Sequence, residues 1–419
     1  MKFSEFEFAE TIQHAIEASG YDDATPIQIA AIPAILAGKD ILAGARTGTG
    51  KTAAFALPLL QKLLSVSEGS VDGTEDENKK DKSLKILVLA PTRELAQQVN
   101  DSFKRYAKGS NFRSAVVYGG VGIKPQIEQI NKGIDLLVAT PGRLLDLNKK
   151  RAVNLSQIET LVFDEADRML DMGFKDEIRS VLSKLPKRDK KPRQTLLFSA
   201  TLNDNIFRFS KNLLVKPELI EVDQRSTASS DVEQVVYNCD PERKLALVTH
   251  LITKEGWQQT LIFSRTKQGA DKITAFLQES ELRAEAIHAD RSQASREQAL
   301  ADFKVGVLQV LVATDVAARG IDIQGLEAVI NFEVPYKAED YVHRIGRTGR
   351  AGRQGKAITL LIEEENYLLE EIEVLLDTRL AQQWLVGFEP DLTRTVETSN
   401  KNTRSAQKRR AKKRAFKKK

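Results

Sequence analysis

The chain has 419 residues, which is too long for one ordinary hydrophobic core and predicts two or three domains. Its composition, 41% hydrophobic and 29% charged, is typical of a soluble globular protein, and no apolar run approaches the roughly 20 residues of a membrane span. Cys239 is the only cysteine, which excludes an intrachain disulfide and a cysteine-based zinc site. Acidic residues follow Met1 where a signal peptide needs an apolar run, so we expect a cytoplasmic protein without a membrane partner.

Short apolar runs alternate with longer amphipathic segments along the chain, which predicts parallel α/β sheets. Several of the apolar runs are nearly continuous, as expected for strands buried on both faces. In the first half we expect strands at 41–43, 85–90, 115–118, 136–139, 161–164 and 195–199, and helices at 52–64 and 93–107. The polar residues 65–83 between two of these elements predict a surface loop insertion without chemistry.

The apolar rhythm stops at 223–231, where small polar residues predict an interdomain linker. It resumes with strands expected at 232–238, 260–264, 284–287, 309–313, 328–332 and 357–362. The chain is therefore predicted to contain two similar α/β halves, of which only the first has a phosphate-binding loop.

The basic charge is concentrated at the end of the chain. The net charge of the whole chain is +5, and residues 401–419 contain eleven Lys or Arg and no Asp or Glu, so residues 1–400 carry −6. A run of this kind repels itself and buries little apolar surface, which predicts a disordered tail that binds polyanions. The alternative is a tail that only improves solubility.

A glycine-rich turn, Gly48-Thr49-Gly50-Lys51-Thr52, follows the first predicted strand. In such a turn the backbone N–H groups surround a triphosphate, the lysine neutralises charge near the β- and γ-phosphates, and the threonine hydroxyl ligates Mg²⁺. Ala45 stands where the strict pattern has glycine, so the turn alone is also compatible with a strand–helix connection that binds nothing.

The acidic segment Asp164-Glu165-Ala166-Asp167 follows another buried strand, about 110 residues later. Carboxylates in this position can hold the magnesium ion and orient a water molecule, although acidic residues also suit an ordinary helix start. The occurrence of both segments, each after a strand, predicts an NTPase that uses ATP and Mg²⁺.

These segments belong to a larger set of motifs that resembles the DEAD-box RNA helicases, most closely the bacterial RhlE subgroup, from residue 3 to about residue 390. The resemblance implies two RecA-like domains that face each other across a cleft for ATP and RNA. The domains are then expected at 1–222 and 232–385, joined by the 223–231 linker, and the tail is expected at 386–419.

The resemblance also implies the residues of an ATP site. Gln28 lies in a segment like the family's adenine-recognising one, and its amide has the donor and the acceptor that adenine requires. Tyr21 is the expected stacking partner of the base, Thr52 and Asp164 hold Mg²⁺, and Glu165 orients the attacking water. The full set of nucleotide contacts is Phe3, Tyr21, Gln28, Thr47, Gly48, Thr49, Gly50, Lys51, Thr52 and Asp322.

In the second half, Arg347 and Arg350 match the arginine fingers that stabilise charge on the γ-phosphoryl group. Lys51, Asp164, Glu165 and these two arginines form the expected catalytic set. Ser199, Thr201 and His343 match positions that link hydrolysis to domain closure.

Segments rich in Thr, Gly and Arg are expected to bind RNA by the resemblance. The expected contacts are Pro91, Thr92, Arg93, Gly120, Thr140, Pro141, Gly142, Arg143, Arg265, Arg296 and Thr314. Hydroxyl, amide and guanidinium groups contact phosphates and 2′-hydroxyls, and the quoted segments contain no aromatic residue, so binding is expected to be nearly independent of sequence. Without the resemblance, the same residues read as ordinary loop and helix-cap residues.

Arg46, Ala289 and Glu333 depart from the residues that the family more often has, which bears on the rate of the reaction and not on its class. The expected activity is ATP-dependent local unwinding of short RNA duplexes by a monomer, in ribosome assembly or RNA turnover, with proteins of those processes as partners. The alternatives are an ATP-gated RNA clamp and a DNA translocase.

Overall fold

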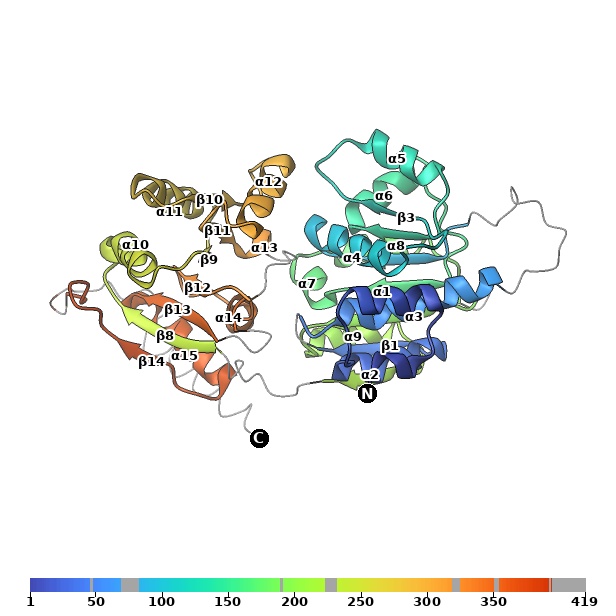
Figure 1. The fold of residues 1–419 in the computed structure, drawn as a ribbon, viewed down its shortest axis with the longest axis horizontal. Helices are drawn as coiled ribbons and strands as arrows, with labels where there is room; N and C mark the ends of the chain where they lie inside the picture. Colours follow the sequence, from blue (N-terminus) through green and yellow to red (C-terminus); the bar gives the residue numbers. More distant parts are fainter. Residues whose placement is uncertain are drawn as a thin grey trace. The chain divides into compact units, whose positions relative to one another are not determined.

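The computed structural model describes residues 1–45, 48–68, 83–188, 191–222, 232–318, 325–349, 354–391 and 393. The chain divides into two compact units, one comprising Met1–Gln224 and Arg319–Asp322 and the other Arg225–Ala318 and Ile323–Lys419 (Figure 1). Within the described residues, each unit is built on its own seven-stranded parallel sheet. The predicted linker 223–231 and the basic segment 401–419 lie outside the described residues.

The first unit begins with a short 3₁₀ helix, η1 (Phe3–Phe6), and its strands follow the order β3-β4-β2-β5-β6-β1-β7 across the sheet. The strands are β1 (Ile41–Gly44), β2 (Ile86–Leu89), β3 (Ser114–Val117), β4 (Leu136–Ala139), β5 (Thr160–Phe163), β6 (Gln194–Ser199) and β7 (Glu218–Glu221). The helices are α1 (Glu10–Ala18), α2 (Pro26–Leu36), α3 (Lys51–Glu68), α4 (Arg93–Tyr106), α5 (Ile123–Asn131), α6 (Pro141–Lys149), α7 (Ala166–Asp171), α8 (Lys175–Leu182) and α9 (Asp204–Lys211).

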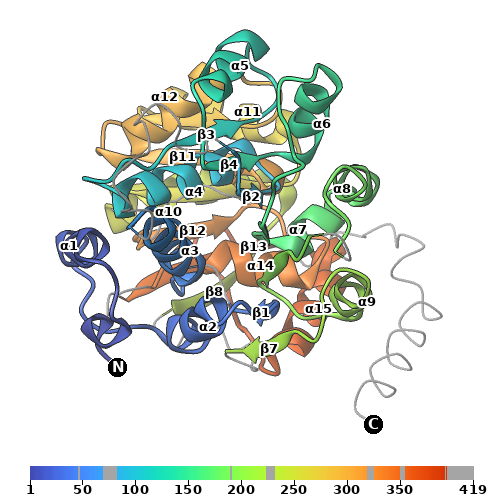
Figure 2. The ribbon, with the colours of Figure 1, turned by 90° about the vertical axis from the view of Figure 1, so that its right-hand side faces the viewer.

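Successive residues of the central strands enter two different cores because side chains alternate between the faces of a sheet. Val88 and Val162 pack with α1 to α4, whereas Leu87 and Leu161 pack with α6 to α9. Figure 2 shows these two groups of helices on opposite faces of the first sheet. Burial on both faces explains the continuous apolar runs, and each fully buried Leu or Val contributes about 1.5–3 kcal/mol relative to exposure.

The second unit repeats the strand order of the first, in the sequence β10-β11-β9-β12-β13-β8-β14. The strands are β8 (Val232–Asn238), β9 (Thr260–Ser264), β10 (Ala284–Ile287), β11 (Val310–Thr314), β12 (Ala328–Asn331), β13 (Gly355–Leu361) and β14 (Ala381–Gln383). The helices are η3 (Pro241–Arg243), α10 (Lys244–Glu255), α11 (Lys267–Glu279), α12 (Gln293–Lys304), α13 (Asp315–Ala318), α14 (Ala338–Ile345), η4 (Glu363–Glu365) and α15 (Asn366–Leu376). The prediction of two similar α/β halves is confirmed.

The predicted strands are confirmed, and their ends agree with the structure within two residues. The prediction missed β7 and β14, each at one edge of its sheet, since β7 has only two apolar residues between two glutamates and β14 is exposed throughout. The predicted loop 65–83 begins too early because α3 continues to Glu68, and residues 69–82 lie outside the described residues. Phe388, near the start of the predicted tail, packs against the ring of His250 with centroids 5.3 Å apart.

Candidate active site and nucleic-acid interface

Apart from Phe3, Tyr21 and Gln28, which precede β1, the predicted site residues of the first unit follow six neighbouring strands at the carboxyl-terminal edge of the sheet. The carboxyl ends of parallel strands share an edge, and that edge is where open α/β sheets bind ligands. The adjacent strands β5, β6 and β1 precede the predicted ATP segments 164–167, 199–201 and 48–52. The adjacent strands β3, β4 and β2 precede the predicted RNA segments 119–120, 140–143 and 91–93. One edge therefore holds two groups of segments, one on each half of the sheet.

The phosphate-binding loop ends at the first residue of α3, so its backbone N–H groups lie at a helix N-terminus that favours anions. Gly50 has a φ of 89°, and a Cβ there would lie 2.3 Å from Nε2 of Gln28, so another residue would strain the backbone and displace Gln28. The buried ammonium of Lys51 donates to the carbonyl oxygen of Ala45 at 2.7 Å. Arg46 and Thr47 lie outside the described residues.

Gln28 connects the start of α2 to the phosphate-binding loop. Its Oε1 accepts a hydrogen bond from the backbone N–H of Thr25 at 2.8 Å, and its Nε2 donates to the carbonyl oxygen of Gly50 at 3.2 Å. Thr25 is the N-cap residue of α2, so the bond from its N–H to Gln28 also stabilises the start of this helix. Gln28 is thus held beside the loop, buried to 4% exposure.

Tyr21 and Phe3 lie together at the N-terminal end of the unit. Their rings stack with centroids 5.9 Å apart and an interplanar angle of 25°. The hydroxyl of Tyr21 is 3.3 Å from that of Tyr106, and Phe3 is buried. Phe3 therefore supports one side of Tyr21, which remains half-buried.

Asp164 and Glu165 leave β5 into a buried, strained turn. Burial raises the pKa of Asp164 to about 7, while the nearby ammonium of Lys51 acts in the opposite direction. Glu165 has a φ of 54°, a left-handed conformation that costs roughly 1–3 kcal/mol in a non-glycine residue and is frequent at functional sites. The carboxylate of Asp164 and the hydroxyl of Thr52 are the oxygen donors that Mg²⁺ prefers, and a divalent cation would offset the cost of ionising Asp164. The residues therefore fit the ion, which would neutralise phosphate charge there.

Asp167 links this turn to the segment after β6. Its Oδ2 accepts hydrogen bonds from the backbone N–H of Thr201 at 3.0 Å and from the hydroxyl of Thr201 at 3.1 Å. The hydroxyl of Ser199 donates to the carbonyl oxygen of Thr201 at 2.7 Å. Asp167 was not among the predicted site residues, because its partner lies 34 residues away in the sequence and nothing local signals the pair.

The predicted RNA segments of the first unit meet around residues 119–121. The guanidinium of Arg93 lies over Gly120, where a Cβ would be 2.2 Å from Nη2 and where φ is 77°. Arg143 donates from Nη2 to the carbonyl oxygen of Val121 at 3.0 Å. Thr92 caps α4 by accepting from the N–H of Leu95 at 3.3 Å.

The remaining predicted residues of these segments lie at strand and helix ends. Thr140, Pro141 and Gly142 form the start of α6, and Pro91 follows the end of β2. The structure thus brings the predicted RNA residues of this unit together at one edge.

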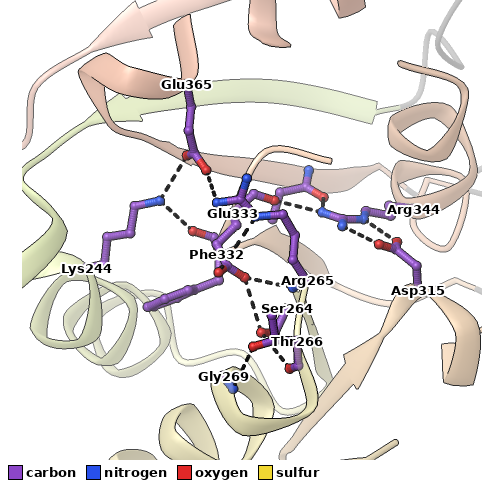
Figure 3. Close-up of polar contacts among 11 residues, drawn as sticks. Lys244, Ser264, Arg265, Thr266, Gly269, Asp315, Phe332, Glu333, Arg344 and Glu365 are labelled. Carbon is purple, nitrogen blue, oxygen red and sulfur yellow. Dashed lines mark hydrogen bonds and ion pairs between the residues drawn. The ribbon is translucent and has the colours of Figure 1, made fainter. Parts of the chain in front are cut away.

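Arg265 follows β9 in the second unit, where two glutamates engage it (Figure 3). Glu333 accepts from the backbone N–H of Arg265 at 2.7 Å and from the hydroxyl of Ser264 at 3.2 Å. Glu365 accepts from the guanidinium. Glu333, one of the three departures noted in the sequence, therefore holds a predicted RNA segment in place.

Arg344 anchors α14, the helix that carries His343 and precedes Arg347. Its guanidinium forms a bidentate pair with Asp315, with nitrogen–oxygen distances of 2.6 and 2.7 Å (Figure 3). A third nitrogen donates to the carbonyl oxygen of Glu333 at 2.8 Å. Arg344 was not among the predicted site residues, because its burial and its pairing with Asp315, 29 residues away, cannot be read from the sequence.

The other predicted residues of the second unit are dispersed over several elements. Thr314 ends β11 beside Asp315, and Arg296 lies buried on α12. Ala289, the second departure, is exposed after β10. Asp322 and Arg350 lie outside the described residues.

Both units match known protein families. Residues 25–209 match the family model described as DEAD/DEAH box helicase, and residues 243–352 match the model described as helicase conserved C-terminal domain. The ATP-dependent RNA helicase CshA of Listeria monocytogenes is 41% identical over 400 residues, which span 94% of this chain and 74% of that protein. The chain belongs to the DEAD-box RNA helicase family.

Other relatives of this DEAD-box helicase support the fold as well. CshA of Bacillus subtilis is 40% identical over 371 residues, covering 88% of this chain and 72% of that protein. Dbp5 of S. cerevisiae, solved bound to RNA and ADP BeF3, has a TM-score of 0.79 and 30% identity, covering 91% and 95% of the two chains. Mss116 bound to ssRNA and UDP-BeF has a TM-score of 0.80 and 27% identity, covering 93% and 80%. The predicted RecA-like fold and ATP-dependent RNA helicase activity are confirmed.

Among the described residues, no helix has both the length and the hydropathy needed to cross a bilayer.

Proposed function

We propose that this ATP-dependent RNA helicase opens short RNA duplexes locally and binds the RNA backbone without reading its sequence. The observation that carries the proposal is the division of one sheet edge in the first unit. ATP segments follow β5, β6 and β1, and RNA segments follow β3, β4 and β2. A strand bound at one half of the edge would lie beside the nucleotide at the other half.

In the proposed ATP site, Lys51 binds the phosphates and Thr52 and Asp164 hold Mg²⁺, which would neutralise charge on the transferring group. Glu165 orients the attacking water, and the left-handed turn at this residue fixes its direction. A movement of this turn would also move Thr201, because Asp167 accepts two hydrogen bonds from it.

The nucleotide is further held by Phe3, Tyr21, Gln28, Thr47, Gly48, Thr49, Gly50 and Asp322. Arg347 and Arg350 of the second unit act as arginine fingers on the γ-phosphate, with Ser199, Thr201 and His343 in the coupling between the units. Charge stabilisation of this kind accounts for about 10³–10⁵ in the rate of related reactions.

RNA binding in the proposal depends on hydroxyl, amide and guanidinium groups. Arg93, Gly120 and Arg143 meet at one loop cluster, which can follow a sugar–phosphate backbone. The first unit also contributes Pro91, Thr92, Thr140, Pro141 and Gly142, and the second unit contributes Arg265, Arg296 and Thr314. Such contacts position a strand and carry little sequence information.

Several finer assignments complete the proposal. We place the functional domains at 1–222 and 232–385, with a polyanion-binding tail at 386–419. We also propose the RhlE subgroup within the family, a cytoplasmic monomer, and a role in ribosome assembly or RNA turnover with proteins of those processes as partners. The basis for each is the motif set and the charge distribution of the chain.

The second candidate is an ATP-gated RNA clamp, in which hydrolysis only resets binding. Both activities would use the same residues, so a strand-separation assay on a short RNA duplex at saturating ATP distinguishes them. Release of the labelled strand only with ATP supports unwinding, and RNA-stimulated hydrolysis without release supports the clamp.

A further inference from the structure

A buried cluster of four charges lies beside the predicted RNA-binding loop after β9 (Figure 3). Lys244 and Arg265 supply two positive charges, and Glu333 and Glu365 supply two negative ones. The side chains of Lys244 and Glu365 are each 5% exposed, and those of Arg265 and Glu333 are 18% and 22% exposed. The cluster is electrically neutral, which is what burial of this kind requires.

Glu365 is fixed between two cations. Its Oε2 lies 3.3 Å from Nζ of Lys244, and its Oε1 accepts from Nη2 of Arg265. Lys244 is itself held, because it donates to the carbonyl oxygen of Phe332 at 2.8 Å. The carboxylate of Glu365 is therefore held in one position and cannot move with Arg265 toward a bound RNA.

Glu333 holds Arg265 from the segment that follows β12, the strand paired with β9. Its Oε2 accepts from the backbone N–H of Arg265, and its Oε1 lies 3.8 Å from Nε of the same residue. The guanidinium also lies over the ring of Tyr336, 4.7 Å from the centroid. We call Glu333 and Glu365 together the glutamate clamp.

A guanidinium between two carboxylates is a poor phosphate ligand, since those carboxylates cancel its charge and repel the anion. The backbone of residues 264–266 is held in place by Glu333, which accepts from the N–H of Arg265, and by further contacts within the loop. The hydroxyl of Ser264, which Glu333 holds, also lies 3.2 Å from the carbonyl oxygen of Thr266, and the hydroxyl of Thr266 caps α11 by accepting from the N–H of Gly269 at 2.9 Å. The ordered groups of this loop are thus its backbone and hydroxyls.

We propose that Arg265 is a positioning residue, held by the glutamate clamp so that the backbone and hydroxyl groups of residues 264–266 meet the RNA. This inference rests on the proposed function. It changes the role of Arg265 within that function, from direct contact with a phosphate to positioning of the loop that contacts the RNA. It also assigns roles to Lys244 and Glu365, which lie outside the predicted motifs.

The direction of change in RNA affinity separates the two roles. In Glu365→Gln, the net charge of the cluster rises from zero to +1, and the guanidinium of Arg265 loses the nearer of its two carboxylate partners. A positioning role predicts that a short fluorescein-labelled poly(U) RNA binds about tenfold more weakly, because hydrogen bonds to charged groups contribute at this level. A contact role predicts tighter binding, because the freed guanidinium would reach a phosphate. Tighter or unchanged binding overturns the proposal.

Salt dependence gives an independent readout. The double variant Arg265→Met/Glu365→Gln keeps the cluster neutral while removing the guanidinium. A positioning role predicts weaker binding with an unchanged slope of log K against log salt. Loss of about 0.7 from the slope would show a lost phosphate contact on single-stranded RNA and would contradict the proposal.

Glu373→Gln is the matched control, since Glu373 is another buried glutamate of this unit and is paired with Arg379. Steady-state ATPase assays should show a raised RNA concentration at half-maximal stimulation for Glu365→Gln, with maximal turnover within about twofold of wild type. An equal effect in both variants, or a loss of turnover alone, would indicate a merely structural role.

If Glu365→Gln does not fold, Glu333→Gln removes the other arm of the clamp and has the same expected outcome. Failure of the wild-type protein to separate RNA strands would instead contradict the proposed function, and it would leave this comparison of affinities unaffected.

Discussion

The buried carboxyl group of Asp164 makes the first unit less stable at neutral pH than it would be with a neutral side chain. Its pKa is raised from 3.8 to about 7, chiefly by burial. Between about pH 4 and 7, the folded protein retains a proton that the unfolded chain has lost, so wild-type stability falls as pH rises through this window. The cost reaches about 4 kcal/mol above pH 7, because each pH unit between the two pKa values corresponds to about 1.4 kcal/mol. Asp164→Asn removes this cost.

The variant should therefore gain up to about 4 kcal/mol at pH 8 and less than about 2 kcal/mol at pH 5. Guanidinium unfolding without nucleotide or Mg²⁺, followed by far-ultraviolet circular dichroism, reports both units. The chain has two tryptophans, Trp257 and Trp384, and both belong to the second unit. Their fluorescence transition is an internal control that should not move. An equal gain at both pH values, or no gain at all, would refute the assigned burial of Asp164.

Three further outcomes are expected. Glu165→Gln should retain ATP and RNA binding but lose about 10²–10⁴-fold in hydrolysis, because an amide cannot act as a base, and turnover near the wild-type rate would exclude that role. Gln28→Ala should weaken ATP binding and lower the preference for ATP over GTP in competition binding by about tenfold or more. An unchanged preference would show that Gln28 does not recognise adenine and has only the structural role given by its hydrogen bonds to Thr25 and Gly50. Deleting residues 401–419 should weaken RNA binding while hydrolysis at saturating RNA is retained. The slope of log K against log salt should become several units shallower if half of the eleven cations bind phosphate, whereas equal slopes would favour a solubilising tail.

The central strands of both sheets could be predicted from the sequence because burial on both faces demands continuous apolar runs. The strand Leu136–Ala139, for example, is predicted and observed with the same ends. The edge strands β7 and β14 could not be predicted in this way, since their pairing depends on backbone groups of a neighbour and not on apolar side chains. Their sequences carry no pattern of their own.

The candidate site divides in a similar way. Gly50, Lys51 and Asp164 are recognisable because phosphate and magnesium chemistry needs these residue types at fixed spacing along the chain. The bonds of Asp167 to Thr201, and the clamp of Glu333 and Glu365 on Arg265, join residues that are distant in sequence. These side chains hold the predicted site residues in place through contacts between distant parts of the sequence, so they can be identified only in the folded chain.

Strand separation tests the account most directly. A short RNA duplex with one fluorescent strand is mixed with the wild-type protein, saturating ATP and Mg²⁺, and an excess of unlabelled competitor strand. The account predicts release of the labelled strand that requires ATP hydrolysis and proceeds similarly for duplexes of equal stability and unrelated sequence. RNA-stimulated hydrolysis that releases no strand, or release confined to one sequence, would contradict it.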